Sequence, residues 1–430
     1  MTYEYIPNSV QVFMDKITEK CGEDHQDWAQ NFNAAFANTL LTTVKRHEDG
    51  TTFLLTGDIP AMWLRDSTAQ VRPYLVVAKE DEDLAAMISG LVKKQFFYIN
   101  IDPYANAFNE ESNGAGHQDD HTEMNDWIWE RKYEIDSLCY PVQLAYLLYK
   151  NTGRTDQFNE DFVSGVKKIL DVFEVEQDHN QSPYNFVRDT WRKEDTLIND
   201  GKGVAVAPTG MTWSGFRPSD DACDGGGYLV PANMFAVVIL GYLEEIFTSV
   251  LTDTNIVEKA KTLREEIQAG IEAHGRTQNA AGEDIYAYEV DGLGHASIMD
   301  DSNVPNLISA PYLGYGSMDD ERYLRTRSTL LSKENPYFYE GKYAKGIGSS
   351  HTPENYIWPI AMAMEGMTTA DKAEKERILN QLVATDAGTH LMHEGFDVDD
   401  PTQYTREWFS WANMMFCELV MDYFDIKVEK

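Results

Sequence analysis

Residues 28–44, WAQNFNAAFANTLLTTV, place large apolar side chains at every fourth position, namely Trp28, Phe32, Phe36, Leu40 and Val44. This spacing aligns the five side chains along one face of a helix and predicts an amphipathic α-helix. Comparable patterns recur roughly over residues 8–20, 66–79, 82–99, 133–151, 162–173, 230–250, 256–271, 319–332, 354–367, 369–386 and 404–424. The sequence therefore predicts a mainly α fold.

Strand signals are sparse, and residues 51–55, 182–188 and 284–290 predict short hairpin pieces. The connections 100–128, 176–229, 275–318 and 334–354 are long and rich in Gly, Trp, Asp, His and Arg. Long structured connections usually carry function. No Pro/Gly/Ser-rich linker divides the chain. We expect a toroid of paired helices with elaborate loops at one end.

The chain is strongly acidic, with 36 Lys and Arg against 71 Asp and Glu and a formal net charge of −35. This charge argues against nucleic acid and anionic membranes as partners, because Lys and Arg supply that affinity. A neutral or cationic ligand fits better. The first twenty residues lack a signal-peptide apolar run, and the longest apolar stretch, 235–243, is about half a membrane span. We expect a soluble, cytoplasmic protein.

The first candidate binding loop is GDIPAMWLRDS, residues 57–67. An exposed indole can stack on a sugar ring, while Arg and Asp hydrogen-bond neighbouring hydroxyls. Trp63, Arg65 and Asp66 are therefore candidate sugar-binding residues. The structural alternative is that Asp66 or Ser67 caps the following helix; Asp136 is expected to cap a core helix in the same way.

The second is HQDDHTE, residues 117–123. An extended segment would place His117, Asp119, His121 and Glu123 on one side. A metal site, a sugar-binding wall and a solvated acidic loop are all compatible with this pattern. We expect no metal, because a short alternating polar run is a weak motif.

The third is TGMTWSGFRPSDDACD, residues 209–224, in which Trp213 and Arg217 precede two adjacent carboxylates, Asp220 and Asp221. Adjacent carboxylates raise one another's pKa, as a general acid at neutral pH requires. The structural alternative is an Asp-lined helix N-terminus.

The fourth is THLMHEGFD, residues 389–397, which offers Glu394 between two predicted helices. Arg406 follows in a stretch that combines Arg with Trp, although a charge-rich helix start would also explain it. Further candidate binding residues stand at the end of a predicted strand and at the start of a predicted helix: Arg188, Asp189, His351 and Asn355.

Together these loops indicate carbohydrate chemistry. Nucleotide-binding, zinc-protease and serine-hydrolase motifs are absent from the sequence. Two separated carboxylate loops are what glycoside hydrolysis needs.

The stretches DIPAMWLRDS (58–67), GMTWSGFRPSDD (210–221) and HEGF (393–396) resemble glycoside hydrolase family 125, the exo-α-1,6-mannosidases, over about residues 10–425. The resemblance implies a single (α/α)6 barrel over 1–430, an inverting mechanism, and no metal or other cofactor. It also implies an Asp acid and a Glu base, which we assign to Asp221 and Glu394, with Asp220 as the neighbouring alternative for the acid.

The expected substrate is an α-mannoside oligosaccharide such as an N-glycan fragment, cleaved by a monomer. Two alternatives remain, an inverting glycoside phosphorylase on the same toroid and a non-enzymatic glycan-binding protein.

Overall fold

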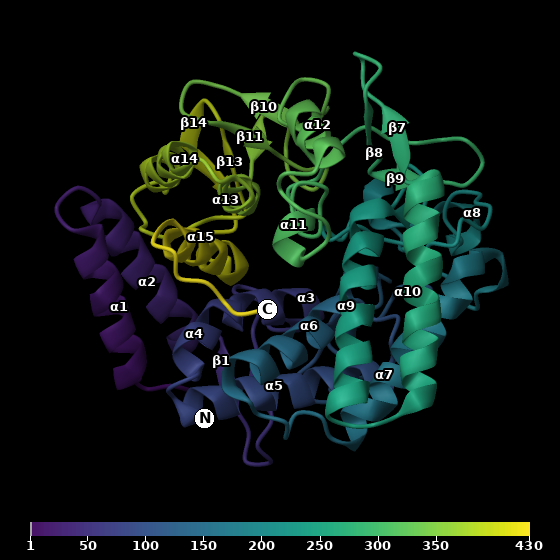
Figure 1. The fold of residues 1–430 in the computed structure, drawn as a ribbon, viewed down its shortest axis with the longest axis horizontal. Helices are drawn as coiled ribbons and strands as arrows, with labels where there is room; N and C mark the ends of the chain where they lie inside the picture. The colour runs from purple at the N-terminus through teal and green to yellow at the C-terminus, as the bar shows by residue number, and fades with distance from the viewer. Residues whose placement is uncertain (1) are drawn as a thin grey trace.

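The computed structural model describes residues 2–430 and shows helices arranged in a closed ring (Figure 1). Helices nearest the centre are buried on almost every side, whereas those outside bury one face. The inner helices are α3 (Leu64–Val71), α6 (Ile135–Thr152), α9 (Val230–Ser249), α11 (Ala310–Leu313), α13 (Pro359–Met367) and α15 (Ser410–Tyr423). The outer helices are α2 (Gln26–Thr42), α5 (Glu82–Ile101), α7 (Glu160–Val175), α10 (Thr254–His274), α12 (Glu321–Leu330) and α14 (Lys372–Ala384).

The ring closes by bringing the two halves of the chain together. Along the inner row, α3 packs on α6, α6 on α9, α13 on α15, and α15 returns to α3. The early outer helix α2 packs against the late helices α14 and α15, so purple and yellow segments adjoin in Figure 1. The remaining helical segments are α1 (Asn8–Cys21), α4 (Leu75–Ala78), α8 (Ile198–Gly201), and the 3-10 turns Arg72–Tyr74, Glu176–Gln181 and Lys193–Asp195.

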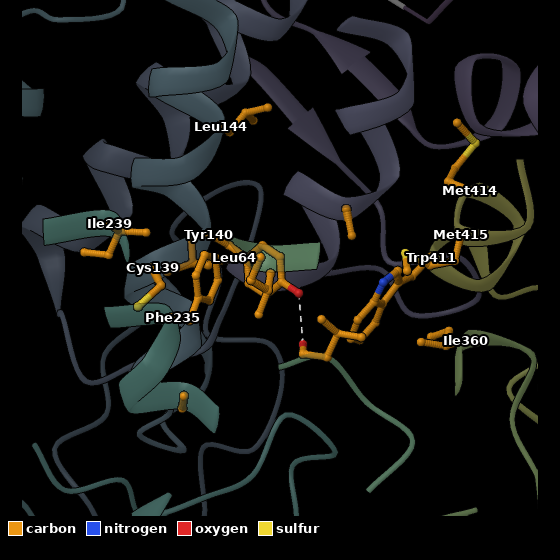
Figure 2. Packing of buried hydrophobic residues seen from close by; sticks show 14 of the residues in the cluster. Leu64, Cys139, Tyr140, Leu144, Phe235, Ile239, Ile360, Trp411, Met414 and Met415 are labelled. Atoms are coloured by element: carbon orange, nitrogen blue, oxygen red, sulfur yellow. Dashed lines mark hydrogen bonds between the residues drawn. The ribbon is translucent and has the colours of Figure 1, made fainter. Parts of the chain in front are cut away.

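The core lies where the inner helices face one another. Figure 2 shows this packing through Leu64 of α3, Cys139 and Tyr140 of α6, Phe235 and Ile239 of α9, Ile360 of α13, and Trp411, Met414 and Met415 of α15. The Tyr140 hydroxyl donates to the Val304 carbonyl oxygen at 3.0 Å, so its polar end is satisfied inside this apolar centre. Each such fully buried side chain contributes about 1.5–3 kcal/mol to folding.

Helix α9 is apolar on more than one side because it is an inner helix. Within residues 2–430 it alone has the length and composition to cross a membrane, with a mean hydropathy of 1.5. However, 67% of that window is buried inside the fold, where α9 packs against α6 and α10. Burial in the ring accounts for its composition.

The strands form six small antiparallel sheets in the described part of the chain. Four are hairpins or pairs: β1 (Val44–Arg46) with β2 (Thr52–Leu54), β6 (Tyr228–Leu229) with β9 (Glu289–Val290), β7 (Arg276–Gln278) with β8 (Asp284–Tyr286), and β10 (Phe338–Glu340) with β11 (Lys345–Ile347). Two have three strands: β3 (Met62–Trp63), β4 (Ala107–Phe108) and β5 (Ile128–Glu130); and β12 (Tyr356–Ile357), β13 (Gly395–Asp397) and β14 (Asp400–Thr405). Strands β3, β5, β12 and β14 lead into α3, α6, α13 and α15, so both sheets lie at the N-terminal ends of inner helices.

The mainly α prediction is confirmed, and several local predictions are corrected. Residues 182–188 form no strand; only Val187 makes an isolated bridge, to His121. Helices α13 and α15 begin later than their patterns indicated, because β12 and β14 occupy the preceding residues. The cap expected at Asp136 is wrong, because Glu134 stands at the cap position of α6 and Asp136 lies in its first turn. The alternative of a cap at Asp66 or Ser67 also fails, because Trp63 stands at the cap position of α3.

Candidate functional site

A cavity of about 120 Å³ lies at the end of the ring where α3, α13 and α15 begin. Four aromatic residues form part of its wall, namely Trp63, Trp358, Phe409 and Trp411. The charged and titratable residues on the wall are Arg65, Asp66, Asp220, His351, Glu394 and Arg406. The fold therefore gathers side chains from the first, third and fourth predicted loops around one small polar and aromatic space.

Arg65 is the centre of the densest charge cluster. Its side chain is 3% exposed, and its Nη1 donates to Glu134 Oε2 at 2.6 Å and to Asp136 Oδ2 at 3.1 Å. Its Nη2 donates to Asp220 Oδ1 at 3.0 Å, and its Nε lies 3.5 Å from Asp66 Oδ2. One guanidinium thus faces four carboxyl groups.

The cluster retains protons because burial penalises several negative charges around one positive charge. Burial raises the pKa of Asp66 and of Asp136 to about 6, in spite of the opposing Arg65 charge. Burial raises the pKa of Glu134 well above its usual range. Burial would also raise the pKa of Asp220, but the Arg65 charge and the hydrogen bond with Glu134 outweigh it and lower that pKa.

A tight turn separates the two adjacent carboxylates of the third loop. Asp220 adopts a left-handed backbone conformation with φ of 65°. The Asp220 amide donates to the Arg217 carbonyl oxygen at 2.9 Å, and the Arg217 amide donates to the Asp221 carbonyl oxygen at 2.7 Å. This turn points the Asp220 side chain to the cavity and the Asp221 side chain away from it.

Asp221 lies behind the cavity wall and is fully buried. Its Oδ2 accepts from the Ser350 hydroxyl at 2.6 Å, and its Oδ1 lies 3.0 Å from His351 Nδ1 and 3.4 Å from Arg192 Nη2. Burial favours a raised pKa for Asp221, but the hydrogen bond and charge of His351 lower it overall. The structure therefore places Asp220, the neighbouring alternative for the acid, on the cavity wall and Asp221 behind it.

His351 lines the cavity and is held by the buried Asp221 carboxylate. Burial lowers the pKa of His351, but Asp221, with smaller contributions from Glu394 and Asp220, raises it to about 9. An imidazolium therefore stands in the cavity at neutral pH.

Glu394 is fixed at the start of the β13–β14 hairpin, where its amide donates to the Thr405 carbonyl oxygen at 3.2 Å. Arg406 Nη1 lies 3.7 Å from Glu394 Oε1. The same guanidinium donates to Asp58 Oδ1 at 2.6 and 2.9 Å and to the Thr56 carbonyl oxygen at 2.8 Å. Arg406 thus joins the first and fourth predicted loops beside Glu394.

Several polar atoms on the wall are buried without a hydrogen-bond partner among the residues that the structure describes. They are Trp63 Nε1, Arg65 Nε, Asp66 Oδ2, Ser219 Oγ and Trp411 Nε1. Buried polar groups normally find partners. A ligand with several hydroxyl groups would satisfy donors and acceptors of this kind, and the aromatic surfaces would contact its C–H face.

The sequence matches the metal-independent α-mannosidases, glycoside hydrolase family 125, over residues 25–421. The chain belongs to this family.

Similar proteins agree with this membership. A metal-independent α-mannosidase of Streptococcus pneumoniae, solved in a non-productive complex with α-1,6-mannobiose, is 60% identical, with a TM-score of 0.97, and the match covers 99% of this chain and 100% of that one. The meiotically up-regulated gene 157 protein of Schizosaccharomyces pombe is 36% identical over 97% of this chain and 88% of that protein. A bacterial glucoamylase complexed with acarbose is 12% identical, with a TM-score of 0.60 over 97% of this chain and 58% of that chain, which shows likeness of fold.

Family membership establishes a glycoside hydrolase of the α-mannosidase type on the predicted (α/α)6 ring. The structure divides the predicted site residues into those that line the cavity and those that lie outside it. The residues that the structure brings to the cavity are Trp63, Arg65, Asp66, Asp220, His351, Glu394 and Arg406.

Other predicted residues have structural roles instead. Trp213 is 1% exposed and stacks on His179 with ring centroids 3.4 Å apart, so it belongs to the core. Arg217 is buried in ion pairs with Glu289 and Asp224. Two others pair with carboxylates outside the cavity: Arg188 with Asp120 and Glu130, and Asn355 with Asp397 and Asp399.

The predicted wall at residues 117–123 is also corrected. His117, Asp119, His121 and Glu123 are exposed and lie outside the cavity, as does the exposed Asp189. The segment turns rather than extends, because the Asp120 amide donates to the His117 carbonyl oxygen at 3.1 Å. Alternate residues therefore do not share a side. Within residues 2–430, His, Cys, Asp and Glu side chains form no group that could hold a metal ion.

Several residues at or behind the wall were not predicted from the sequence. Trp358, Phe409 and Trp411 stand beside predicted site residues, and the Trp–Arg pattern could have included them. Asn303 carries no comparable signal. Glu134 and Asp136, which bind Arg65 from the start of α6, were overlooked because Asp136 resembled a helix cap.

Proposed function

We propose that this α-mannosidase is an inverting exo-enzyme that removes a non-reducing terminal mannose from α-1,6-linked mannosides. The observation that carries the proposal is the shared position of Asp220 and Glu394 on one small wall of aromatic and unpartnered polar groups. Glycoside hydrolysis needs two carboxyl groups that flank the scissile bond.

Asp220 is the proposed general acid, and it protonates the glycosidic oxygen as the bond to the departing sugar breaks. Glu394 is the proposed general base, and it takes a proton from the water that attacks the anomeric carbon from the opposite face. In this reaction one water is consumed, and the released mannose has the inverted, β configuration. Because the bond that forms lies opposite the bond that breaks, each carboxyl group serves one role only.

Positively charged side chains stand beside both carboxyl groups. Arg406 Nη1 lies 3.7 Å from Glu394 Oε1, and the His351 imidazolium lines the same cavity. Arg65 orients the Asp220 carboxyl group from behind, while the unpartnered groups of Trp63, Asp66 and Ser219 can bind sugar hydroxyls.

Two observations support the exo mode and the linkage. A cavity of about 120 Å³ suits a single terminal sugar better than the middle of a chain. The 60% identical α-mannosidase of Streptococcus pneumoniae was solved with α-1,6-mannobiose. We extend the proposal to N-glycan fragments as substrates, cytoplasmic action, a monomeric enzyme and no metal requirement.

Linkage-defined α-mannobioses test the proposal directly, with the anomer of freshly released mannose identified by proton NMR. We expect turnover of the α-1,6 isomer and β-mannose as the first product, in the presence of a chelator and without phosphate. First-formed α-mannose would contradict inversion, and a requirement for phosphate would favour a phosphorylase. Tight mannoside binding without turnover would favour a glycan-binding protein.

A further inference from the structure

Glu134 has an unusual setting for a group outside the cavity wall. It lies directly before α6 and its side chain is fully buried. Its Oε2 accepts from Arg65 Nη1 at 2.6 Å and from the Ser137 hydroxyl at 2.8 Å. One carboxyl oxygen is therefore fully provided with donors.

The other oxygen, Glu134 Oε1, is buried, and no N–H or O–H donor of residues 2–430 reaches it. Asp220 is its neighbour, because the Arg65 guanidinium binds Glu134 through Nη1 and Asp220 through Nη2. Two carboxyl groups held side by side on one buried guanidinium disfavour a second negative charge, so one of them keeps a proton. The pair therefore shares one proton at the back of the proposed acid.

The charges around the pair indicate which partner holds the proton. Arg65 and Asp66 face it from α3, Lys132 and Asp136 from the segment leading into α6, and Cys223 from the loop that carries Asp220. Lys132 Nζ donates to the Asp220 carbonyl oxygen at 2.7 Å, and its positive charge lowers the Asp220 pKa. Burial raises the pKa of Glu134, whereas Asp220, which borders the cavity, has a lowered pKa. The Glu134 side chain is fully buried, whereas that of Asp220 is 22% exposed at the cavity, so the lower cost of ionising Asp220 assigns the proton of the free enzyme to Glu134.

We propose that Glu134 is the positioning residue that stores the proton and supplies it to Asp220 for transfer to the departing sugar. The inference rests on the proposed function, because it needs Asp220 as the acid. The Glu134 O–H bond breaks as an Asp220 O–H bond forms. That bond breaks in turn as the glycosidic oxygen takes the proton and the electron pair of the C–O bond. Glu394 takes one proton from water, and exchange with solvent resets both groups.

Glu134→Gln tests the inference, because the amide fills the same space and can donate to Asp220 but has no acidic proton to give. We compare α-1,6-mannobiose with an activated aryl α-mannoside, 2,4-dinitrophenyl α-mannoside, whose leaving group needs no protonation. We expect kcat for mannobiose to fall on the order of 10²-fold. Turnover of the aryl substrate should change by only a few-fold, and the alkaline limb of the mannobiose pH profile should move to lower pH.

The matched control is Glu289→Gln. Glu289 is equally buried and accepts from an arginine, Arg217 Nε, at 2.5 Å, but it lies outside the cavity. Glu289→Gln should change kcat for mannobiose and kcat for the aryl substrate by the same factor. Equal losses on the two substrates in Glu134→Gln, with an unmoved pH profile, would overturn the inference.

Asp220→Asn separates this inference from the proposed function. If Asp220→Asn shows the leaving-group selectivity and Glu134→Gln does not, Glu134 has no part in proton supply and Asp220 remains the acid. If Asp220→Asn lacks the selectivity, the acid assignment itself fails. If Glu134→Gln shows no thermal unfolding transition and so does not fold, Glu134→Asp is measured in its place. The inference then requires that Glu134→Asp lower kcat more for mannobiose than for the aryl substrate.

Discussion

Asp220 and Asp221 are neighbours in sequence with opposite surroundings, and their variants should differ accordingly. Asp220→Asn removes the proposed acid from the cavity and should lower mannobiose turnover on the order of 10²–10⁴-fold, with little change in stability. Asp221→Asn leaves the acid in place but weakens the bond to His351, so it should lower the free energy of unfolding. Steady-state kinetics and urea unfolding of both variants measure these effects. A stable but inactive Asp221→Asn beside an active Asp220→Asn would reverse the assignment.

Glu394→Gln should abolish hydrolysis while preserving mannoside binding. The amide is isosteric and cannot accept the proton of water, so the loss should lie in the upper part of the range of about 10²–10⁴. Added azide should restore turnover with an activated substrate and give a β-mannosyl azide, because a small anion needs no base. Calorimetric titration with mannobiose checks binding. The matched control, Glu407→Gln, changes an exposed carboxylate of the same hairpin region and should remain active.

The raised pKa of His351 predicts a dependence of stability on pH. Its pKa is about 9 in the folded state, above the unfolded value of about 6.5. Its stabilising contribution is therefore complete below about pH 6.5 and is lost as the pH rises through about 9. Urea unfolding at about pH 6 and pH 9.5 should show a larger decline for the wild type than for His351→Gln. Parallel declines would show that His351 does not carry this linkage.

At the scale of elements, the cavity depends on a close contact between the first loop and the segment after β14. Gly57 has φ of +68°, and a Cβ there would lie 2.6 Å from the Trp408 carbonyl oxygen. Gly57→Ala should lower the free energy of unfolding by about 1–3 kcal/mol through backbone strain, with a further cost from this clash. It should also raise KM, because Arg406 and Trp63 border the same contact.

Gly282→Ala is the control for this prediction. Gly282 has a similar φ of +79°, but no atom lies within 4 Å of the position that a Cβ would take there, so only backbone strain remains. Urea unfolding should show the smaller loss in Gly282→Ala, with unchanged KM. Equal losses in the two variants would mean that the contact with Trp408 contributes nothing.

Helices were predictable from the sequence, whereas most strands were not. A long helix such as α5 repeats its apolar pattern over several turns, and α5 was predicted nearly to its ends. Strands such as β12 have two residues, too few for an alternation to be visible. Their positions depend on pairing with β13, which is distant in sequence.

The site was predictable in part from segments dense in charged and aromatic residues. Glu394 was predicted from such a loop and Arg406 from the stretch that follows it, and both reach the cavity. Trp213 had an equally good motif but stacks in the core, because nothing local in a sequence distinguishes an exposed indole from a buried one. The choice between Asp220 and Asp221 depended on the left-handed φ of Asp220, and no residue pattern in the sequence indicates that backbone conformation.

For the whole molecule, the closed ring predicts that unfolding is a single cooperative transition, as expected for one domain over residues 1–430. Helix α2 packs on α14 and α15, so neither end of the chain can leave without opening the ring. Trp28 of α2 stabilises the contact between α2 and α14. Its side chain is 1% exposed, and its Nε1 donates to Asn380 Oδ1 of α14 at 2.9 Å. Calorimetry should show one peak, and two separated peaks would contradict the single domain.

Trp28→Ala should lower the free energy of unfolding by about 3–5 kcal/mol, because it leaves a cavity and an unpaired amide at the point of closure. The single peak should move to lower temperature without splitting. Since Trp28 lies outside the cavity that contains Glu394, KM at temperatures where the variant is folded should stay unchanged. Trp191→Ala is the matched control for stability, because Trp191 is 92% exposed and its removal should leave the transition in place. A Trp28→Ala variant with an early second peak would show that the ring opens at this joint before the rest unfolds.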